Sequence, residues 1–367
     1  MSAALAVFTY DLGASFIDKH VEGVRPGRTV AIGTYGRHPA LASLWPMACP
    51  ALLLDRWALR VPVRLARRAG MSQEAMRDLA IRAFLRRHGV GAVLGEYLDQ
   101  FLDFAPLVER LRLPYVVQAH GIDVSASIRR PEMAQRYLRY AGARAILTRC
   151  EHHRRRLLEV GLPEDKVHVN PGGVAIPPAP PVRDDSAARR LLAIGVMVPK
   201  KGPIYLLEAF RRALEQEPRL TLDYIGGGDL MPAAEHFVVM FGLQDRIRLL
   251  GFVPEDVKQR LLRECGVFVQ HSITNPNTGD EEGLPAAIQE AMAQGMAVVS
   301  TRHSGIPEAV VDGLTGLLVD EGDVNGMAAA MVEASRRPRD LGEQGYRRAA
   351  ELYAFEDENA RLRKWLS

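Results

Sequence analysis

The chain has 367 residues, of which 47% are hydrophobic and 25% charged, and its formal net charge is +3. That length exceeds one ordinary hydrophobic core and predicts two domains of comparable size, while the lack of any run of ~18 apolar residues argues against a membrane-spanning helix. Three scattered cysteines, and a first segment without the basic region of a signal peptide, indicate a reduced, cytoplasmic protein without a disulfide framework or zinc site.

The two halves of the chain differ in charge. Residues 1–175 carry 25 Lys+Arg against 16 Asp+Glu, a net of +9, whereas the remainder carries 22 against 28, a net of −6. A basic half suits an anionic membrane surface, a phosphate-bearing acceptor or nucleic acid. We therefore expect the two halves to have different tasks.

Short apolar runs in the N-terminal half predict buried strands at residues 6–10, 28–33, 91–97, 114–120, 144–149 and 166–171. Residues 175–181 (AIPPAPP) follow, and their prolines predict an extended linker instead of a helix or central strand.

Beyond the linker, the alternation of strands and helices is clearer. Strands are predicted at residues 190–195, 220–226, 246–251, 267–271, 297–301 and 316–319. Helices are predicted at 204–216, after the strand 220–226 up to about 241, at 256–264 and at 284–294. This order predicts βαβ units and parallel sheets covered on both faces. The expected fold class is α/β, with two doubly wound, Rossmann-like domains (1–176 and 177–351) facing across a cleft and ligands beyond the carboxyl ends of the strands.

Two carboxylates eight positions apart, Glu282 and Glu290, flank a Gly-Leu-Pro turn in EEGLPAAIQE. An acid/base pair for cutting sugar chains is disfavoured, because eight helical residues rise about 12 Å and glycosidase carboxylates stand about 5–9.5 Å apart. A second interpretation is that both are solvated surface charges. Glu282, however, follows a predicted strand, and Glu290 lies among small apolar residues.

The third interpretation is a clamp on one elongated ligand. A helix beginning near Pro285 offers free backbone N–H groups and the positive end of its dipole, which together bind anions. A sugar nucleotide fits, with its ribose hydroxyls on Glu290, its diphosphate at the helix terminus and its sugar on Glu282.

The same stretch resembles the E-x7-E element of glycosyltransferase family 4, retaining enzymes of the GT-B fold, and residues 280–319 look most like the colanic-acid-type exopolysaccharide branch. The resemblance implies that a sugar moves from a nucleotide-diphosphate sugar to a hydroxyl of a saccharide or lipid-linked acceptor, in polysaccharide biosynthesis. No cofactor is expected, and the lack of a D-x-D sequence gives no reason to expect a metal. Residues 352–367 would pack back on the N-terminal domain.

The resemblance also implies roles for individual donor-side residues. Lys201 in VPKKG would bind the diphosphate and stabilise the leaving group, but Val196 stands after Gly195 where the family usually has a second cation, an arginine. Lys200 could replace it. The other implied donor-binding residues are Gly227 in GGGD, Phe252 near the base, Gly283 and Leu284. Glu308 in HSGIPE is expected to be a helix-start charge instead of a catalyst.

In the N-terminal half, HGID resembles the family's HG-x-D element, which implies that His120 lies over the donor sugar and that Asp123 braces its loop. A lone histidine is by default structural, and this alternative stays open. Gly13 belongs to the loop after the first strand, where the family's acidic residue is absent. Catalytic roles are thus predicted for His120, Lys201 and Glu282.

Basic clusters suggest further partners. A helical pattern of arginines with nearby Trp45 and Trp57 suits peripheral contact with an anionic membrane at its inner face, although a solvated face fits equally well; its members are Arg56, Arg60, Arg64, Arg67 and Arg68. Arg154, Arg155 and Arg156 could meet an acceptor phosphate, while His152 and His153 lack the spacing of a metal site. No nucleic acid is expected. A non-catalytic sugar-nucleotide-binding protein, or an epimerase or phosphorylase of similar architecture, remains an alternative.

Overall fold

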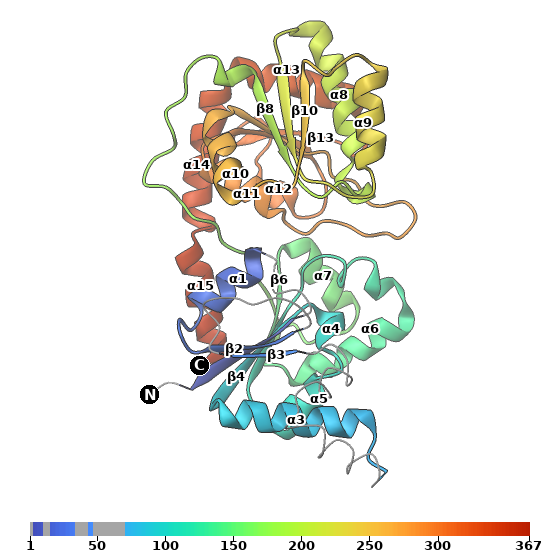
Figure 1. Ribbon diagram of the computed structural model, residues 1–367, viewed down its shortest axis with the longest axis vertical. Coiled ribbons are helices and arrows are strands. Elements are labelled where there is room, and N and C mark those ends of the chain that lie inside the picture. Colours follow the sequence, from blue (N-terminus) through green and yellow to red (C-terminus); the bar gives the residue numbers. More distant parts are fainter. Residues whose placement is uncertain (1–2, 10–14, 34–42, 47–69) are drawn as a thin grey trace. The chain divides into compact units, whose positions relative to one another are not determined.

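The computed structural model describes residues 3–9, 15–33, 43–46 and 70–367, and the chain divides into two compact units (Figure 1). The N-terminal unit comprises Met1–Thr148, Arg156–Val169 and Asn359–Ser367, and the C-terminal unit comprises Arg149–Arg155 and Asn170–Glu358. The chain thus passes from the N-terminal to the C-terminal unit between residues 169 and 170. The proline-rich segment 175–181 follows a few positions later and forms no helix or strand.

The described residues of the N-terminal unit form seven parallel strands in the order β3-β2-β1-β4-β5-β6-β7. Strands β1, β2 and β5 are buried throughout, and β4 is buried from Ala92 onward, as expected for a parallel sheet with both faces covered. The strands are β1 (Ala4–Phe8), β2 (Thr29–Gly33), β3 (Ser43–Pro46), β4 (Val90–Glu96), β5 (Tyr115–Gln118), β6 (Ala145–Thr148) and β7 (Val167–Val169). All six strands predicted for this half are confirmed, and β3 is an addition.

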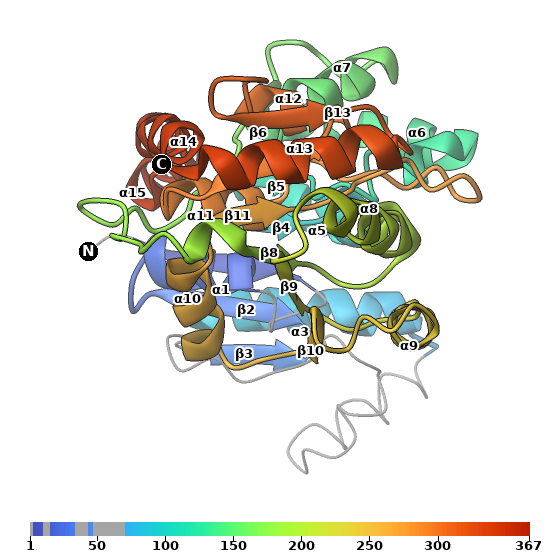
Figure 2. The ribbon, with the colours of Figure 1, turned by 90° about the horizontal axis from the view of Figure 1, so that it is seen from above.

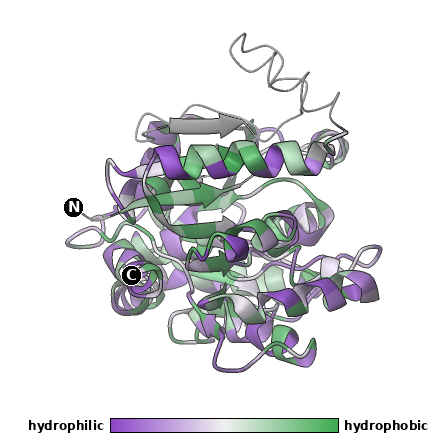
Figure 3. Ribbon diagram, turned by 90° about the horizontal axis from the view of Figure 1, so that it is seen from below, coloured by the Kyte–Doolittle hydropathy of each residue, from purple (hydrophilic) through white to green (hydrophobic). Residues whose placement is uncertain are grey.

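Side chains alternate between the two faces of this sheet and divide its core in two. Along β5, Tyr115 and Val117 belong to one hydrophobic cluster and Val116 to the other. In Figure 3 most strands of this sheet are coloured hydrophobic, while α3 alternates hydrophobic and hydrophilic residues. The helices are α1 (Ser15–Gly23), α3 (Gln73–Arg87), α4 (Leu98–Phe101), α5 (Ala105–Arg110) and α6 (Pro131–Tyr137). Two more helices, α7 (Glu151–Glu159) and α15 (Phe355–Leu366), begin in the C-terminal unit and end in this one, and α15 lies beside α1.

The C-terminal unit contains six parallel strands in the order β10-β9-β8-β11-β12-β13. Strands β8, β9 and β10 are added in turn toward one edge of the sheet, and β11, β12 and β13 in turn toward the other edge. The order of addition therefore reverses between β8 and β11, which are neighbours in the sheet. The strands are β8 (Arg190–Ile194), β9 (Thr221–Ile225), β10 (Ile247–Gly251), β11 (Val267–Val269), β12 (Ala297–Thr301) and β13 (Gly316–Val319). Each was predicted from the sequence.

Helices cover both faces of the second sheet as well. Val267 and Val269 point into the cluster beneath α8 and α13, which pack against each other (Figure 2), and Phe268 points into the opposite cluster. The helices are α8 (Pro203–Gln216), α9 (Met231–Met240), α10 (Glu255–Glu264), α11 (Ala286–Ala293), α12 (Ile306–Ala309), α13 (Val324–Arg336) and α14 (Pro338–Leu352). Among the described residues, no helix combines the length and apolar character that crossing a membrane requires.

Candidate active site

The segments that follow β8 and β11, the two strands flanking the reversal of the C-terminal sheet, supply the candidate site. Ligands of such sheets bind at this switch point. After β8, the short turn Pro199–Lys201 leads into α8 through Gly202, whose φ is +51°. A Cβ on Gly202 would lie 2.2 Å from the carbonyl oxygen of His271. Glycine is therefore required here on two counts, and it lets the lysine turn lie against the segment after β11.

Two lysines and two carboxylates meet at this point. Lys201 Nζ donates to Glu282 Oε2 at 2.9 Å, while Lys200 Nζ lies 3.1 Å from Asp280 Oδ2 and 3.4 Å from Glu282 Oε1. Burial alone would raise the pKa of Glu282, but Lys201 and Lys200 outweigh it and lower that pKa to about 2. The pKa of Lys200 is raised, because Glu282 and Asp280 outweigh its burial. Glu282 and Lys200 are therefore both charged at neutral pH.

The backbone of Glu282 is held by a histidine that the sequence reasoning did not identify. The Glu282 N–H donates to His303 Nε2 at 3.0 Å, so this ring nitrogen carries a lone pair. The other ring nitrogen, Nδ1, therefore carries the proton and donates to the Glu321 carboxylate. His303 is thus a neutral support fixed in one tautomer. His303 is the first residue of the HSGIPE motif and follows the end of β12, and this position is the signal that could have pointed to it.

The helix start predicted between the two glutamates is present. Pro285 occupies the cap position of α11, so Gly283 and Leu284 directly precede the first free backbone N–H groups. Glu290 lies within α11 and pairs with Lys258 of α10 at 3.2 Å. The side chains of Glu282 and Glu290 are only 12% and 17% exposed. The interpretation of both as solvated surface charges is therefore wrong.

The glycine loop and the exposed aromatic residue predicted beside the nucleotide lie near the end of β8. A Cβ on Gly226 would lie 2.0 Å from the carbonyl oxygen of Gly195, so this close approach again requires glycine. A Cβ on Gly227 would lie 3.2 Å from the Phe252 ring, which places these two residues side by side. Phe252 is 77% exposed, an unusual state for phenylalanine that leaves its ring available for stacking.

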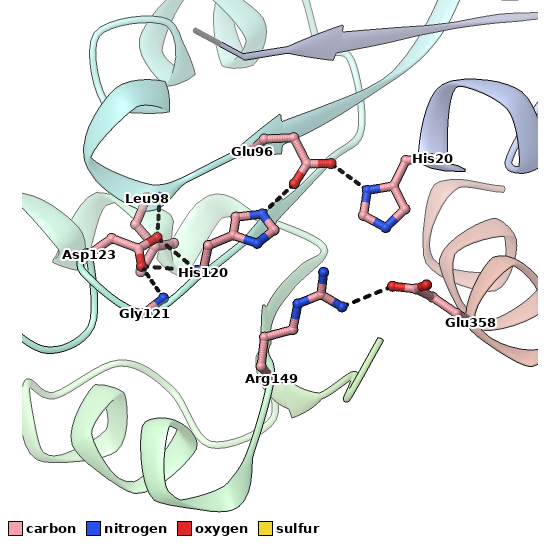
Figure 4. Close-up of polar contacts among 8 residues, drawn as sticks. All are labelled: His20, Glu96, Leu98, His120, Gly121, Asp123, Arg149 and Glu358. Carbon is pink, nitrogen blue, oxygen red and sulfur yellow. Dashed lines mark hydrogen bonds and ion pairs between the residues drawn. The ribbon is translucent and has the colours of Figure 1, made fainter. Parts of the chain in front are cut away.

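In the N-terminal unit, His120 lies beyond the carboxyl end of β5 in a fixed loop (Figure 4). Asp123 accepts hydrogen bonds from the backbone N–H groups of Leu98, His120 and Gly121 at 2.9–3.0 Å, which confirms its predicted bracing role. Burial raises the pKa of Asp123 to about 6 against the opposing effect of these bonds. The ring of His120 contacts Glu96 through Nε2 at 2.6 Å. Glu96 was not identified from the sequence, although a carboxylate ending an apolar strand is a signal.

Residues 188–336, which include Lys201, Glu282 and Glu290, match the family model described as "Glycosyl transferases group 1". The chain carries a glycosyl transferases group 1 domain.

Proteins similar in sequence to this chain are also named as glycosyltransferases. It is 32% identical over 259 residues to the amylovoran biosynthesis glycosyltransferase AmsK of Erwinia amylovora, covering 67% of this chain and 62% of that protein. It is 33% identical over 241 residues to the putative colanic acid biosynthesis glycosyltransferase WcaL of Salmonella typhimurium, covering 64% and 58%. The chain thus spans about three fifths of the length of these curated relatives.

A solved structure has the same fold as this chain. Anabaena HepE, crystallised in complex with UDP, superposes with a TM-score of 0.77 at 16% identity, covering 100% of this chain and 99% of HepE. At this identity the likeness concerns the fold, and it confirms the expected GT-B architecture of two doubly wound sheets.

The remaining residues singled out from the sequence either make contacts within the fold or lie outside the described residues. Glu308 lies in the first turn of α12, as expected for a helix-start charge. Its carboxylate also accepts from the backbone N–H groups of Glu151 and His152 and so caps α7. His152 Nε2 contacts Glu281 at 3.1 Å. Among the described residues, no group of His, Cys, Asp or Glu could hold a metal ion. Gly13 and the arginine pattern from Arg56 to Arg68 lie outside the described residues.

Proposed function

We propose that this protein is a retaining glycosyltransferase that moves a sugar from a nucleotide-diphosphate sugar to a hydroxyl of a saccharide or lipid-linked acceptor during exopolysaccharide synthesis. The observation that carries the proposal is the pairing of Lys200 and Lys201 with Glu282 immediately before α11. These lysines and the helix start supply positive charge at a switch point, where a diphosphate would bind. The names of AmsK and WcaL support the exopolysaccharide context.

The roles proposed for the donor side follow from these contacts. A diphosphate near Lys201 would compete with Glu282 for its ammonium group, freeing the carboxylate to accept sugar hydroxyls. The lysine would then neutralise the charge that develops on the leaving nucleoside diphosphate. Glu290, buried beside Lys258, would accept the ribose hydroxyls, and Phe252 would stack on the base. Binding of UDP in the HepE crystal makes uridine nucleotides the first to test.

Lys200 is proposed to replace the arginine that the family usually has at position 196. Position 196 is a valine, which carries no charge, and it is 46% exposed. The Lys200 ammonium lies within 3.4 Å of the same carboxylate that holds Lys201. Two ammonium groups therefore converge on Glu282 from consecutive residues, and a diphosphate that displaced this carboxylate would meet both.

A donor screen tests the proposed function. The wild-type protein is incubated with UDP-, GDP- and ADP-sugars, with and without glycan or lipid-linked acceptors, and released nucleoside diphosphate is measured. Acceptor-dependent release that is lost in Lys201→Met but kept in Lys166→Met, a lysine of the N-terminal unit, supports transfer. The configuration of the product linkage, measured by NMR, tests retention.

A sugar-nucleotide-binding protein without turnover is the second candidate, and the valine at position 196 favours it. Donor binding detected by thermal shift, without release of nucleoside diphosphate in any acceptor condition, would establish this candidate and overturn the first. Conversion of the donor into its epimer would point to an epimerase.

A further inference from the structure

A fully buried carboxylate in the N-terminal unit lies between two histidines (Figure 4). Glu96, the last residue of β4, directs Oε1 to His20 Nδ1 and Oε2 to His120 Nε2, each at 2.6 Å. Glu96 and His20 are 0% exposed and the side chain of His120 is 5% exposed. Burying an ionised carboxylate is costly unless charged or hydrogen-bonded partners compensate it, so the two imidazoles must supply that compensation.

The chemistry of the carboxylate fixes the histidine tautomers. Burial would raise the pKa of Glu96, but its two histidine partners outweigh that effect and hold the pKa well below its ordinary value. An ionised carboxylate only accepts hydrogen bonds. The ring nitrogens that face it, His20 Nδ1 and His120 Nε2, must therefore both carry protons. A neutral His120 then has its lone pair on Nδ1.

The surroundings hold the His120 ring in one orientation. Its backbone N–H is fixed by Asp123, and the Tyr97 ring lies against it with 4.5 Å between the centroids. Tyr97 has a φ of +63°, a conformation that costs energy for a residue other than glycine. The ring is thus packed on a strained residue and bound by one buried carboxylate, while a second buried carboxylate holds the backbone of the same residue. These contacts indicate a position that the fold holds for more than packing.

We propose that Glu96 is a positioning residue that holds His120 as the Nε2–H tautomer, and that His20 is the imidazolium that balances Glu96, so that His120 stays neutral. The role rests on the proposed glycosyl transfer, in which His120 contacts the donor sugar. With Nδ1 as the acceptor, His120 receives a hydrogen bond from a sugar hydroxyl. His20 and Glu96 act through His120 and do not touch the substrate.

Two other titratable groups contact His120 in the described part of the chain. The Tyr97 ring lies against the His120 ring, and Asp123 accepts from the His120 backbone N–H. Among them, Asp123 has a pKa of about 6, raised by burial, so it titrates near the same pH as a histidine. A variant of Glu96 or His20 retains Asp123, and shifts between variants therefore report on the three residues.

The first test measures the tautomer of His120 in the chain described here, without any activity measurement. Ring ¹⁵N shifts of labelled histidine distinguish protonated from unprotonated nitrogens, and loss of one signal set in His120→Gln assigns them. The expected result is a neutral His120 with its proton on Nε2 and a His20 protonated on both nitrogens at pH 7. A proton on His120 Nδ1 alone, or a neutral His20, overturns the proposal.

The second test uses the acidic limb of the pH dependence of kcat/KM. Glu96→Gln removes the anion that favours a protonated His120, so the limb should move to lower pH by about one unit. His20→Gln removes the competing cation and should move the limb to higher pH. Glu109→Gln, which alters the carboxylate bound to the Tyr115 hydroxyl in the same unit, is the matched control and should leave it in place.

Shifts in the same direction for both variants, or no shift in either, would overturn the proposal. If the wild-type protein shows no turnover with any donor, the proposed glycosyl transfer fails alone, because the tautomer measurement still decides the arrangement of the three residues. If Glu96→Gln does not fold, His20→Gln and the wild-type spectrum keep the proposal testable.

Discussion

Replacing Glu282 by glutamine should destabilise the C-terminal unit, because it removes the carboxylate between two lysines while keeping the side-chain size. The pKa of Glu282 falls from an ordinary 4.5 to about 2; at ~1.4 kcal/mol for each tenfold change in the proton equilibrium, the pairing contributes about 3 kcal/mol. Lys200 keeps Asp280 as a partner, and both lysines reach water in part, so we expect a loss of about 2–3 kcal/mol.

The pH dependence of this loss has a definite sign. The folded pKa of Glu282 lies below its unfolded value, so its stabilisation is complete above about pH 5 and disappears as the pH falls toward 2. The difference between the wild type and Glu282→Gln should therefore be constant near neutral pH and shrink steadily below pH 4.5.

Urea unfolding followed by far-UV circular dichroism is the assay. Tryptophan fluorescence is unsuitable, because all three tryptophans belong to the N-terminal unit. Glu343→Gln is the control: it breaks an exposed pair with Arg347, and exposed pairs contribute about 0.2–1 kcal/mol. A loss in Glu282→Gln no larger than in the control, or a difference that is undiminished at pH 3, would refute the reasoning.

Three further predictions concern single side chains of the C-terminal unit. Because Lys200 is proposed to replace the family's arginine, Val196→Arg should leave donor affinity unchanged in calorimetry, and tighter binding would contradict that role of Lys200. Phe252→Ala should weaken nucleoside diphosphate binding by about 1–3 kcal/mol through lost stacking, with no change in the melting temperature because the ring is 77% exposed; an equal loss in Phe241→Ala, 43% exposed, would contradict a specific role. Glu308→Gln should cost about 1 kcal/mol by weakening the cap of α7, and unchanged hydrogen exchange in that helix would count against it.

The strands of the C-terminal half could be predicted from the sequence because they alternate with helices at regular spacing and most of their residues are apolar. The start of α11 was equally predictable, since Pro285 suits a first helical turn and glycine the turn before it. Strand β3 was not predicted, because a four-residue strand ending in proline carries almost no periodic signal.

Pairings between distant residues could not be predicted. Glu96 and His20 are 76 positions apart and meet only because α1 packs beside the carboxyl end of β4. Likewise, nothing in EEGLPAAIQE shows that Lys258 on another helix neutralises Glu290. The sequence indicates which strand ends gather at one edge of a sheet, but tertiary packing decides which side chains touch there.

Calorimetric binding of a bare nucleoside diphosphate to Glu290→Ala and Glu282→Ala tests the central claim most directly, namely that the two carboxylates grip opposite ends of one sugar nucleotide. The account predicts that Glu290→Ala lowers the affinity for the bare diphosphate at least tenfold, a change of about 1.4 kcal/mol. Glu282→Ala should leave the affinity for the bare diphosphate unchanged and lower only the affinity for the intact sugar nucleotide. Equal losses of affinity for the bare diphosphate in both variants would contradict the account.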